Sequence, residues 1–175
     1  PYPMGYPQHA TPPVFHDGHV FVACGHSTGG TMLRINADSS AVTKVWYMGK
    51  FDNCHGGVMR IGKRLYGSGC RVGGKGFYCV DFLTGKLLGS NPAVGKMSIL
   101  YAGGMLYGLN HTGPMYLMDI TDDGGIKVVS QFNMPGKRKT NIYLAHPVVC
   151  GGRLYLREGE NLYAHDIRAK GPTSK

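Results

Sequence analysis

The segment SILYAGGMLYGLN, residues 98–110, contains the pattern that decides the fold. An apolar run leads into a Gly-Gly pair, and a second apolar run with an aromatic residue, Tyr107, follows it. Two strand-like runs joined by a short glycine-containing turn predict a β-hairpin. The pattern occurs three more times, in PPVFHDGHVFVACG (12–25), GVMRIGKRLYGSG (57–69) and HPVVCGGRLYLRE (146–158).

The four hairpins recur with one period. Their second-strand aromatic residues are 45, 41 and 48 positions apart, and they are Phe21, Tyr66, Tyr107 and Tyr155. A third strand-like run follows each hairpin and ends at a polar residue. These residues are 45, 38 and 47 positions apart, and they are Asn36, Asp81, Asp119 and Asp166. A period of about 40–50 residues with several strands in each repeat is typical of a β-propeller.

A fourth strand-like run completes three of the repeats, at residues 41–48, 85–90 and 126–134. We therefore predict an all-β chain with about four antiparallel, four-stranded propeller blades. Their expected bounds are approximately 9–50, 51–92, 93–136 and 143–170. After Asp166 no apolar run follows, so the last blade is expected to have three strands. Trp46 lies in an outer strand and is expected to pack between blades.

Composition narrows the function classes. Charged residues make up 17% of the chain and hydrophobic residues 42%, which excludes a disordered tail. No run approaches the roughly 18 apolar residues of a membrane-spanning helix. The net charge is +9, but the charges are mostly scattered, with one tight cluster at 137–139. This pattern predicts a basic, solvated surface and no specific binding of nucleic acid.

One repeat resembles a known family. The segment CVDFLTGKLLG (79–89) resembles the repeat of pyrroloquinoline-quinone-type, or quinoprotein-like, propellers, with matches at Asp81, Thr84, Gly85 and Lys86. Gly89 stands where that repeat has a docking tryptophan. The wider layout is similar to secreted bacterial members of the family, in CHGGV (54–58), YAGGMLY (101–107), AHPV (145–148) and DIRAK (166–170).

The resemblance implies that the chain is the C-terminal half of a ring of about eight blades. Two functions stay open. One is a non-enzymatic scaffold or platform that binds a partner, a glycan or a small molecule. The other is part of a quinone-dependent alcohol or sugar dehydrogenase, an oxidoreductase that uses pyrroloquinoline quinone and Ca²⁺ and has most catalytic residues in other blades. No catalytic residue can be assigned in this chain.

The resemblance also implies a secreted or periplasmic location, although the chain itself contains no signal peptide. Half a ring would leave apolar blade faces open, and open faces of that kind associate. We therefore expect the ring to be completed by a second copy of the chain or by an N-terminal half. The alternative is that four blades close by themselves, against which the missing outer strand of the last blade argues.

Candidate site residues come from the starts of the first strands, which border the central channel of a propeller. They are His9, Asn53, Cys54, His55, Lys96 and His146. Imidazole is a common metal ligand, so His9, His55 and His146 are candidate ligands. The alternative is that these side chains form hydrogen bonds with backbone and water at a polar rim.

A disulfide between Cys54 and Cys70 is a separate expectation. If the second hairpin turns at Gly62 and Lys63, Cys70 lies opposite His55 and diagonally from Cys54, which is close enough for a bridge. Unpaired cysteines are the alternative.

Overall fold

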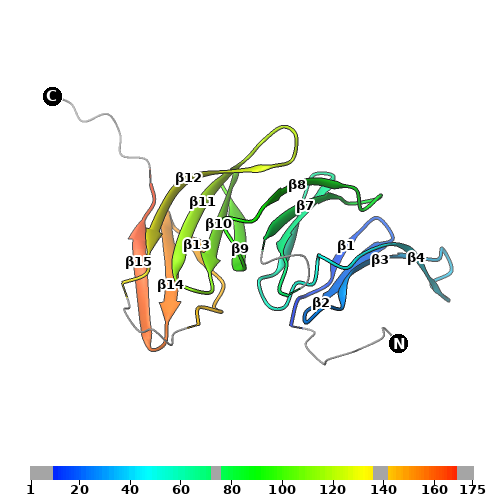
Figure 1. Cartoon of the computed structure of the whole chain (residues 1–175), viewed down its shortest axis with the longest axis horizontal. Coiled ribbons are helices and arrows are strands. Elements are labelled where there is room, and N and C mark those ends of the chain that lie inside the picture. Colours follow the sequence, from blue (N-terminus) through cyan, green and yellow to red (C-terminus); the bar gives the residue numbers. More distant parts are fainter. Residues whose placement is uncertain (1–9, 72–75, 136–141, 169–175) are drawn as a thin grey trace.

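The computed structural model describes residues 10–71, 76–135 and 142–168, and its regular secondary structure in these ranges is entirely β. Four antiparallel sheets follow one another along the chain and are arranged side by side (Figure 1). The expected all-β fold of about four blades is confirmed. Among the described residues, no helix is long and apolar enough to cross a membrane.

Each sheet is built from consecutive strands. The first blade contains β1 (Val14–His16), β2 (His19–Cys24), β3 (Gly29–Ile35) and β4 (Val42–Met48). The second contains β5 (Val58–Ile61), β6 (Arg64–Ser68), β7 (Phe77–Asp81) and β8 (Leu87–Asn91). The third contains β9 (Met97–Ala102), β10 (Met105–Asn110), β11 (Pro114–Ile120) and β12 (Ile126–Asn133). The last contains β13 (Val148–Cys150), β14 (Arg153–Glu158) and β15 (Asn161–Asp166).

The hairpin turns explain why the sequence repeats so visibly. In the third blade Ala102 pairs with Met105, so the turn is the pair Gly103 and Gly104, with φ of 58° and 81°. Two consecutive left-handed residues match the twist of a two-residue hairpin, and glycine adopts that conformation at no steric cost.

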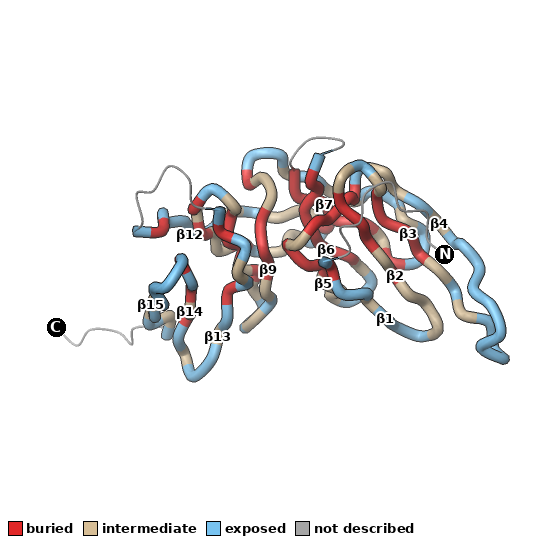
Figure 2. The backbone as a smooth tube through the Cα atoms, turned by 90° about the horizontal axis from the view of Figure 1, so that it is seen from below, coloured by how far each residue is buried: buried red, intermediate tan, exposed pale blue. Residues whose placement is uncertain are grey.

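The hydrophobic core lies between the blades. One cluster joins the first two blades, a second joins the middle two, and a third joins the last two. Figure 2 shows buried residues concentrated in β2, β3, β6, β7 and β9, and exposed residues along β4 and β15. A blade therefore buries its faces only against a neighbouring blade, as expected for a repeat architecture.

Trp46 closes the interface between the first and second blades. Its ring lies 5.4 Å from that of Phe21, and its Nε1 donates a hydrogen bond to the carbonyl of Phe82 at 3.0 Å. A Cβ on Gly85, which has a φ of +69°, would lie 2.5 Å from the indole. The expected packing role of Trp46 is confirmed, and Gly85 is required because the indole lies directly against its backbone.

The other interfaces lack this tryptophan. Strand register places Gly89 and Ser130 at the position of Trp46, because each pairs with the residue just before a register shift in the third strand of its blade. A Cβ on Gly89 would lie 3.0 Å from the Cα of Gly125, so backbone fills that interface.

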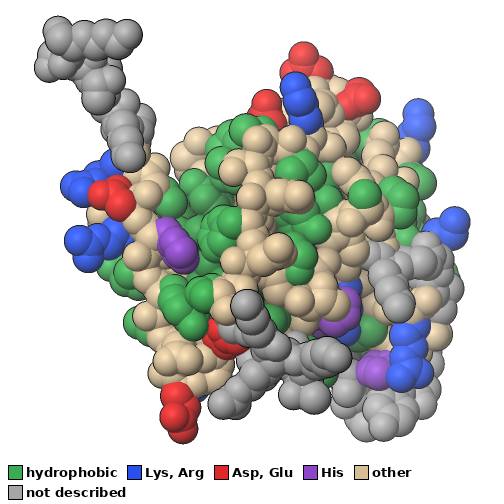
Figure 3. Space-filling view, turned by 60° about the vertical axis from the view of Figure 1, so that its left-hand side comes forward, with side chains coloured by type: hydrophobic (Ala, Val, Ile, Leu, Met, Phe, Trp, Pro, Cys, Tyr) green, Lys and Arg blue, Asp and Glu red, His purple; other side chains and the backbone are tan. Residues whose placement is uncertain are grey.

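Beside Ser130 a cavity of about 130 Å³ remains. Its lining includes Tyr107, Leu117, Leu154 and Ile167. By strand register these four residues correspond to Phe21, Met32, Leu65 and Phe82, which surround Trp46. Figure 3 shows hydrophobic side chains gathered on the side of the molecule where the last blade lies.

This correspondence predicts that Ser130→Trp stabilises the protein. The indole would fill apolar space that Trp46 occupies one interface earlier, with an expected gain of about 1–2 kcal/mol. A chain of this size should then melt about 2–8 °C higher, as measured by circular dichroism. The matched control is Ser90→Trp, on the exposed part of β8, which should give no gain. Destabilisation by Ser130→Trp would show that the two interfaces are not equivalent.

Candidate binding site at the loop face

One end of the blades gathers the loops that carry the candidate residues. In an antiparallel sheet, the start of the first strand and the connection between the second and third strands lie at the same end. We call this end the loop face. Its described segments are residues 24–29, 52–57, 69–71, 94–97, 110–114, 142–147 and 158–161.

Asp52 is the central buried group of the loop face. Its side chain is fully buried, and its carboxylate accepts hydrogen bonds from the backbone N–H groups of Ser27 (3.0 Å), Cys70 (2.7 Å) and Arg71 (2.9 Å). The donors belong to loops of the first and second blades. A buried carboxylate is stable only when such donors replace water, so Asp52 fixes both loops to the segment that leads into β5.

Asn53, one of the predicted candidates, has a structural role. It is buried, and its Nδ2 donates to the carbonyls of Gly57 (3.2 Å) and Ser68 (2.9 Å). Its Oδ1 accepts a 2.6 Å hydrogen bond from the hydroxyl of Thr11. These contacts hold the segment that leads into β5 beside β6, and they use both polar atoms of the amide.

Cys54 and Cys70 are joined by a disulfide, with their Cα atoms 5.9 Å apart. The bridge has the pairing that the hairpin spacing suggested, and it links the start of β5 to the loop after β6. The loop of the first blade lies against it, since a Cβ on Gly25 would be 2.4 Å from the Sγ of Cys54. The remaining cysteines, at 24, 79 and 150, are not part of a disulfide.

His26 completes a compact group with this disulfide. One of its ring nitrogens and the two sulfur atoms all lie within 4.8 Å of one another. His26 and Ser27 both adopt left-handed backbone conformations, with φ of 54° and 76°. Such conformations cost energy in non-glycine residues, and the bond from Ser27 to Asp52 helps to hold the loop in this shape.

A second group consists of basic side chains from three blades, His55, Lys96, His111 and His146, which we call the basic cluster. The ring Nε2 of His146 donates to the carbonyl of His55 at 2.9 Å. The backbone N–H and the ring Nδ1 of His111 both lie within hydrogen-bond distance of the carbonyl of Lys96, at 3.1 and 3.2 Å. The Nζ of Lys96 lies 3.5 Å from the Sγ of Cys70.

The basic cluster has a clear electrostatic signature. Burial, followed by the positive charges of Lys96, His111 and His146, lowers the pKa of His55 from 6.5 to about 4. Burial also lowers the pKa of Lys96. His55 is therefore neutral near pH 7, and a positive field surrounds it.

The predicted candidates are thus mostly brought together. Asn53, Cys54, His55, Lys96 and His146 lie on the loop face, whereas His9 lies outside the described residues. His146 donates to the backbone of His55 and not to its ring. The three-histidine metal site therefore stays a prediction. Sequence reasoning missed Asp52, His26 and His111, although Asp52 directly precedes the predicted Asn53.

A Ca²⁺ ion that binds together with a quinone requires several converging oxygen ligands. The carboxylates in the described segments of the loop face are Asp52, Glu158 and Glu160. Asp52 is occupied by three N–H donors, and Glu158 accepts hydrogen bonds from the hydroxyls of Tyr143 (2.9 Å) and Tyr163 (3.3 Å). These residues belong to different blades, so the described part of the chain does not fit a Ca²⁺–quinone site.

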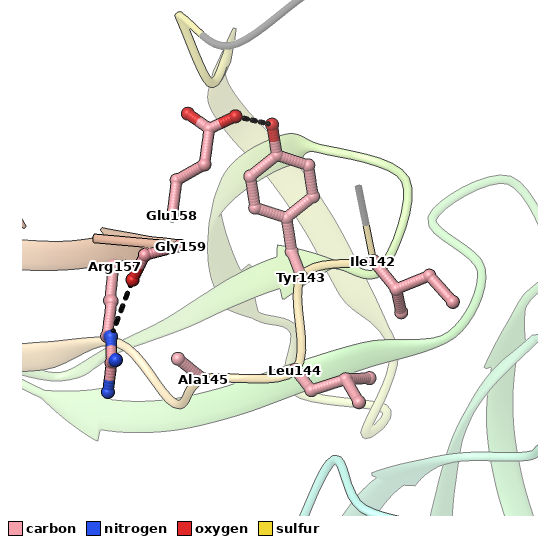
Figure 4. A pocket seen from close by; sticks show the side chains of 7 residues that line it. All are labelled: Ile142, Tyr143, Leu144, Ala145, Arg157, Glu158 and Gly159. Carbon is pink, nitrogen blue, oxygen red and sulfur yellow. Dashed lines mark hydrogen bonds between the residues drawn. The ribbon is translucent and has the colours of Figure 1, made fainter. Parts of the chain in front are cut away.

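A cavity of about 370 Å³ adjoins Tyr143 at the last blade (Figure 4). The ring of Tyr143 points toward Glu158, and the Nε of Arg157 donates to the carbonyl of Gly159 at 2.9 Å. The cavity is lined by polar and apolar residues together, namely Ile142, Tyr143, Leu144, Ala145, Arg157, Glu158 and Gly159. The polar groups that define it already bind one another, so the basic cluster is the better candidate for a binding site.

The fold and the loop face define the chain as a segment of a β-propeller. Among solved structures, it matches the crystal structure of BamB from Moraxella catarrhalis, with a TM-score of 0.60 and 13% sequence identity. The match covers 88% of this chain and 41% of the BamB chain, so the chain spans about two-fifths of its length. No protein-family model and no curated protein sequence matches the chain.

The low pKa of His55 predicts a pH-dependent stability. Between pH 6.5 and 4 the unfolded chain takes up a proton on His55 that the folded chain does not, so acidification favours unfolding. Between about pH 7 and about pH 5, the free energy of unfolding should fall by about 1 kcal/mol more in the wild type than in His55→Gln, a value that allows for solvent screening at the partly exposed ring.

Urea unfolding at the two pH values measures this difference. His16→Gln, which changes an exposed histidine at the opposite end of the first blade, serves as the control and should behave like the wild type. An equal loss of stability in the wild type and in His55→Gln would contradict the assigned burial of His55.

Proposed function

We propose that this protein is a non-enzymatic β-propeller platform that binds an acidic segment of a partner protein at its loop face. The observation that supports the proposal is the basic cluster. Three blades contribute positively charged or protonatable side chains to it, and burial together with these charges lowers the pKa of His55. A field of this sign attracts carboxylates and increases their rate of association.

Few acidic side chains on the loop face offset the positive charges of the basic cluster. Asp52 directs its charge at backbone donors, and Glu158 binds two tyrosine hydroxyls in another blade. The chain as a whole carries a net charge of +9. An incoming carboxylate would meet the histidines and Lys96, whose positive charge Asp52 offsets only in part, because burial still lowers the pKa of Lys96.

The proposal favours a binding platform over a dehydrogenase. The described carboxylates do not converge on a Ca²⁺ site. The loops are tied to one another by hydrogen bonds and by the Cys54–Cys70 disulfide, which suits a preformed surface that loses little entropy on binding. We further propose that the protein acts outside the cytoplasm, where disulfides persist.

Charge reversal at Lys96 tests the proposed site. Binding of a fluorescent glutamate-rich peptide, measured by anisotropy at low salt, should weaken at least about tenfold in Lys96→Glu. The control, Lys63→Glu, has the same charge change at the turn between β5 and β6, at the opposite end of the blade. It should retain nearly wild-type affinity.

A salt titration and a second ligand distinguish the possible explanations of a loss of binding. Raising the salt concentration should weaken binding in the wild type, since exposed charges are screened. If a sulfated oligosaccharide binds and the peptide does not, the ligand of the loop face is a glycan and the proposed acidic protein segment is wrong. An equal loss of peptide affinity in Lys63→Glu and Lys96→Glu would mean that binding depends only on the net charge of the protein, and it would contradict the proposed site.

We also propose that the blades assemble into a closed ring with a second copy or with a further half. Support comes from exposed apolar side chains on the outermost described sheets, such as Val42 (58% exposed) in the first blade and Leu162 (68% exposed) in the last. Blades elsewhere in the chain bury such surfaces against their neighbours.

The mass in solution tests this assembly. The chain alone should elute with about twice its mass of 18.9 kDa in light scattering on a sizing column. Leu162→Glu should shift the protein toward the monomer, whereas the control Leu83→Glu, at an exposed turn of the second blade, should not. A wild-type protein that stays monomeric at high concentration would contradict closure by a second copy.

A further inference from the structure

The group formed by His26, Cys54 and Cys70 has the composition of a soft-metal site. A ring nitrogen and two sulfur atoms lie within 4.8 Å of one another, and they come from three separate loop segments of two blades. Both cysteines are buried, and His26 is half-buried. Two sulfurs and one imidazole are a donor set that Zn²⁺ prefers.

Contacts other than the disulfide hold these three residues together. Asp52 accepts hydrogen bonds from Ser27, next to His26, and from Cys70 itself. Gly25 allows the first-blade loop to reach the sulfur of Cys54, because any larger residue would collide with it. The loops that carry the donors are therefore kept in place by a carboxylate that reduction of the disulfide leaves intact.

The bridge blocks metal binding only while it is oxidised, because the thiolate is the form that binds a metal. An external dithiol that reduces the bridge transfers two electrons and two protons. The Cys54–Cys70 bond breaks, two thiols form, and the dithiol becomes a disulfide. Binding of Zn²⁺ then releases both thiol protons and leaves two Zn–S bonds and one bond to neutral imidazole.

Exchange of the disulfide for a metal site requires the two sulfur atoms to separate. In a tetrahedral site with Zn–S bonds of about 2.3 Å, the two sulfurs lie about 3.7 Å apart. The sulfurs must therefore move apart by a distance that side-chain rotation can supply. The Nζ of Lys96, 3.5 Å from the Sγ of Cys70, places a positive charge where a thiolate would form.

We infer that Cys54 and Cys70 form a redox switch that exchanges a disulfide for a Zn²⁺ site, with His26 as the third protein ligand. The fourth position would be taken by water, because the carboxylate of Asp52 is committed to backbone donors. This site is distinct from the three-histidine group suggested by the sequence, and it shares none of its residues.

Cobalt titration tests the switch, because Co²⁺ bound to thiolates gives charge-transfer and d–d absorption bands. The background for all samples is Cys150→Ser, which removes the exposed thiol. After treatment with a phosphine reductant, the protein should bind one Co²⁺ with thiolate bands, and Zn²⁺ should displace it. The oxidised protein should show no such bands.

Variants separate the site from adventitious thiol binding. Cys70→Ser should abolish the thiolate bands, and His26→Ala should weaken Co²⁺ binding at least about tenfold. His16→Ala is the matched control, since it removes an exposed histidine from the opposite end of the same blade, and it should bind like the background.

Three results would overturn the inference. One is the absence of thiolate bands in the reduced protein. Another is unchanged affinity in His26→Ala, which would leave a pair of cysteines without a built site. The third is loss of the β-sheet circular dichroism on reduction without recovery on addition of Zn²⁺, because it would mean that Asp52 does not hold the loops.

Discussion

The buried carboxylate of Asp52 is the interaction on which the arrangement of the loop face depends. It accepts three backbone hydrogen bonds, from loops of two blades. Hydrogen bonds to a charged group contribute about 1.5–3 kcal/mol each, and a buried donor left without its acceptor costs a similar amount. Because Asp52 also lies in the segment that leads into β5, one residue fixes this segment to the loops that carry His26 and Cys70.

Hydrogen bonds between a loop and the segment before an inner strand also occur later in the chain, with backbone carbonyls as the acceptors. The carbonyl of Lys96, at the start of β9, accepts from His111 in the loop of its own blade. The carbonyl of His111 in turn accepts from the backbone of Tyr143, which leads into the last blade. The segments that lead into β5, β9 and the last blade are thus each hydrogen-bonded to a loop. These bonds, together with the bond from His146 to His55, bring the residues of the basic cluster together.

Much of the fold could be predicted from the sequence, because its causes repeat. The glycine turns, the aromatic residues of the second strands and the polar ends of the third strands recur with one period, and the packing of Trp46 follows from its place in an outer strand. Asp52 and His26 leave no such trace. Their partners are loop residues 18 to 44 positions away, and within the described residues this arrangement occurs at the boundary of the first two blades.

The interfaces show the same limit. Trp46, Gly89 and Ser130 occupy the same register position in their blades. The interface contains an indole at Trp46, a close backbone contact at Gly89 and a cavity beside Ser130. A repeat pattern identifies the position but not what fills it, because the filling depends on turn residues of the next blade. Gly89 in place of a tryptophan is therefore a different packing solution and not a defect of the repeat.

Lys96 connects the two proposed activities of the loop face. It belongs to the basic cluster, and its Nζ also lies beside the Sγ of Cys70. A disulfide is neutral, and two thiolates with one Zn²⁺ are neutral in sum, so both states leave the charge of Lys96 available to an acidic ligand. Reduced, metal-free cysteines would instead place negative charge beside the Nζ as they ionise. Binding of an acidic partner should therefore be weakest in that state, which makes the oxidised and the zinc-loaded forms equivalent for the partner although their covalent structures differ.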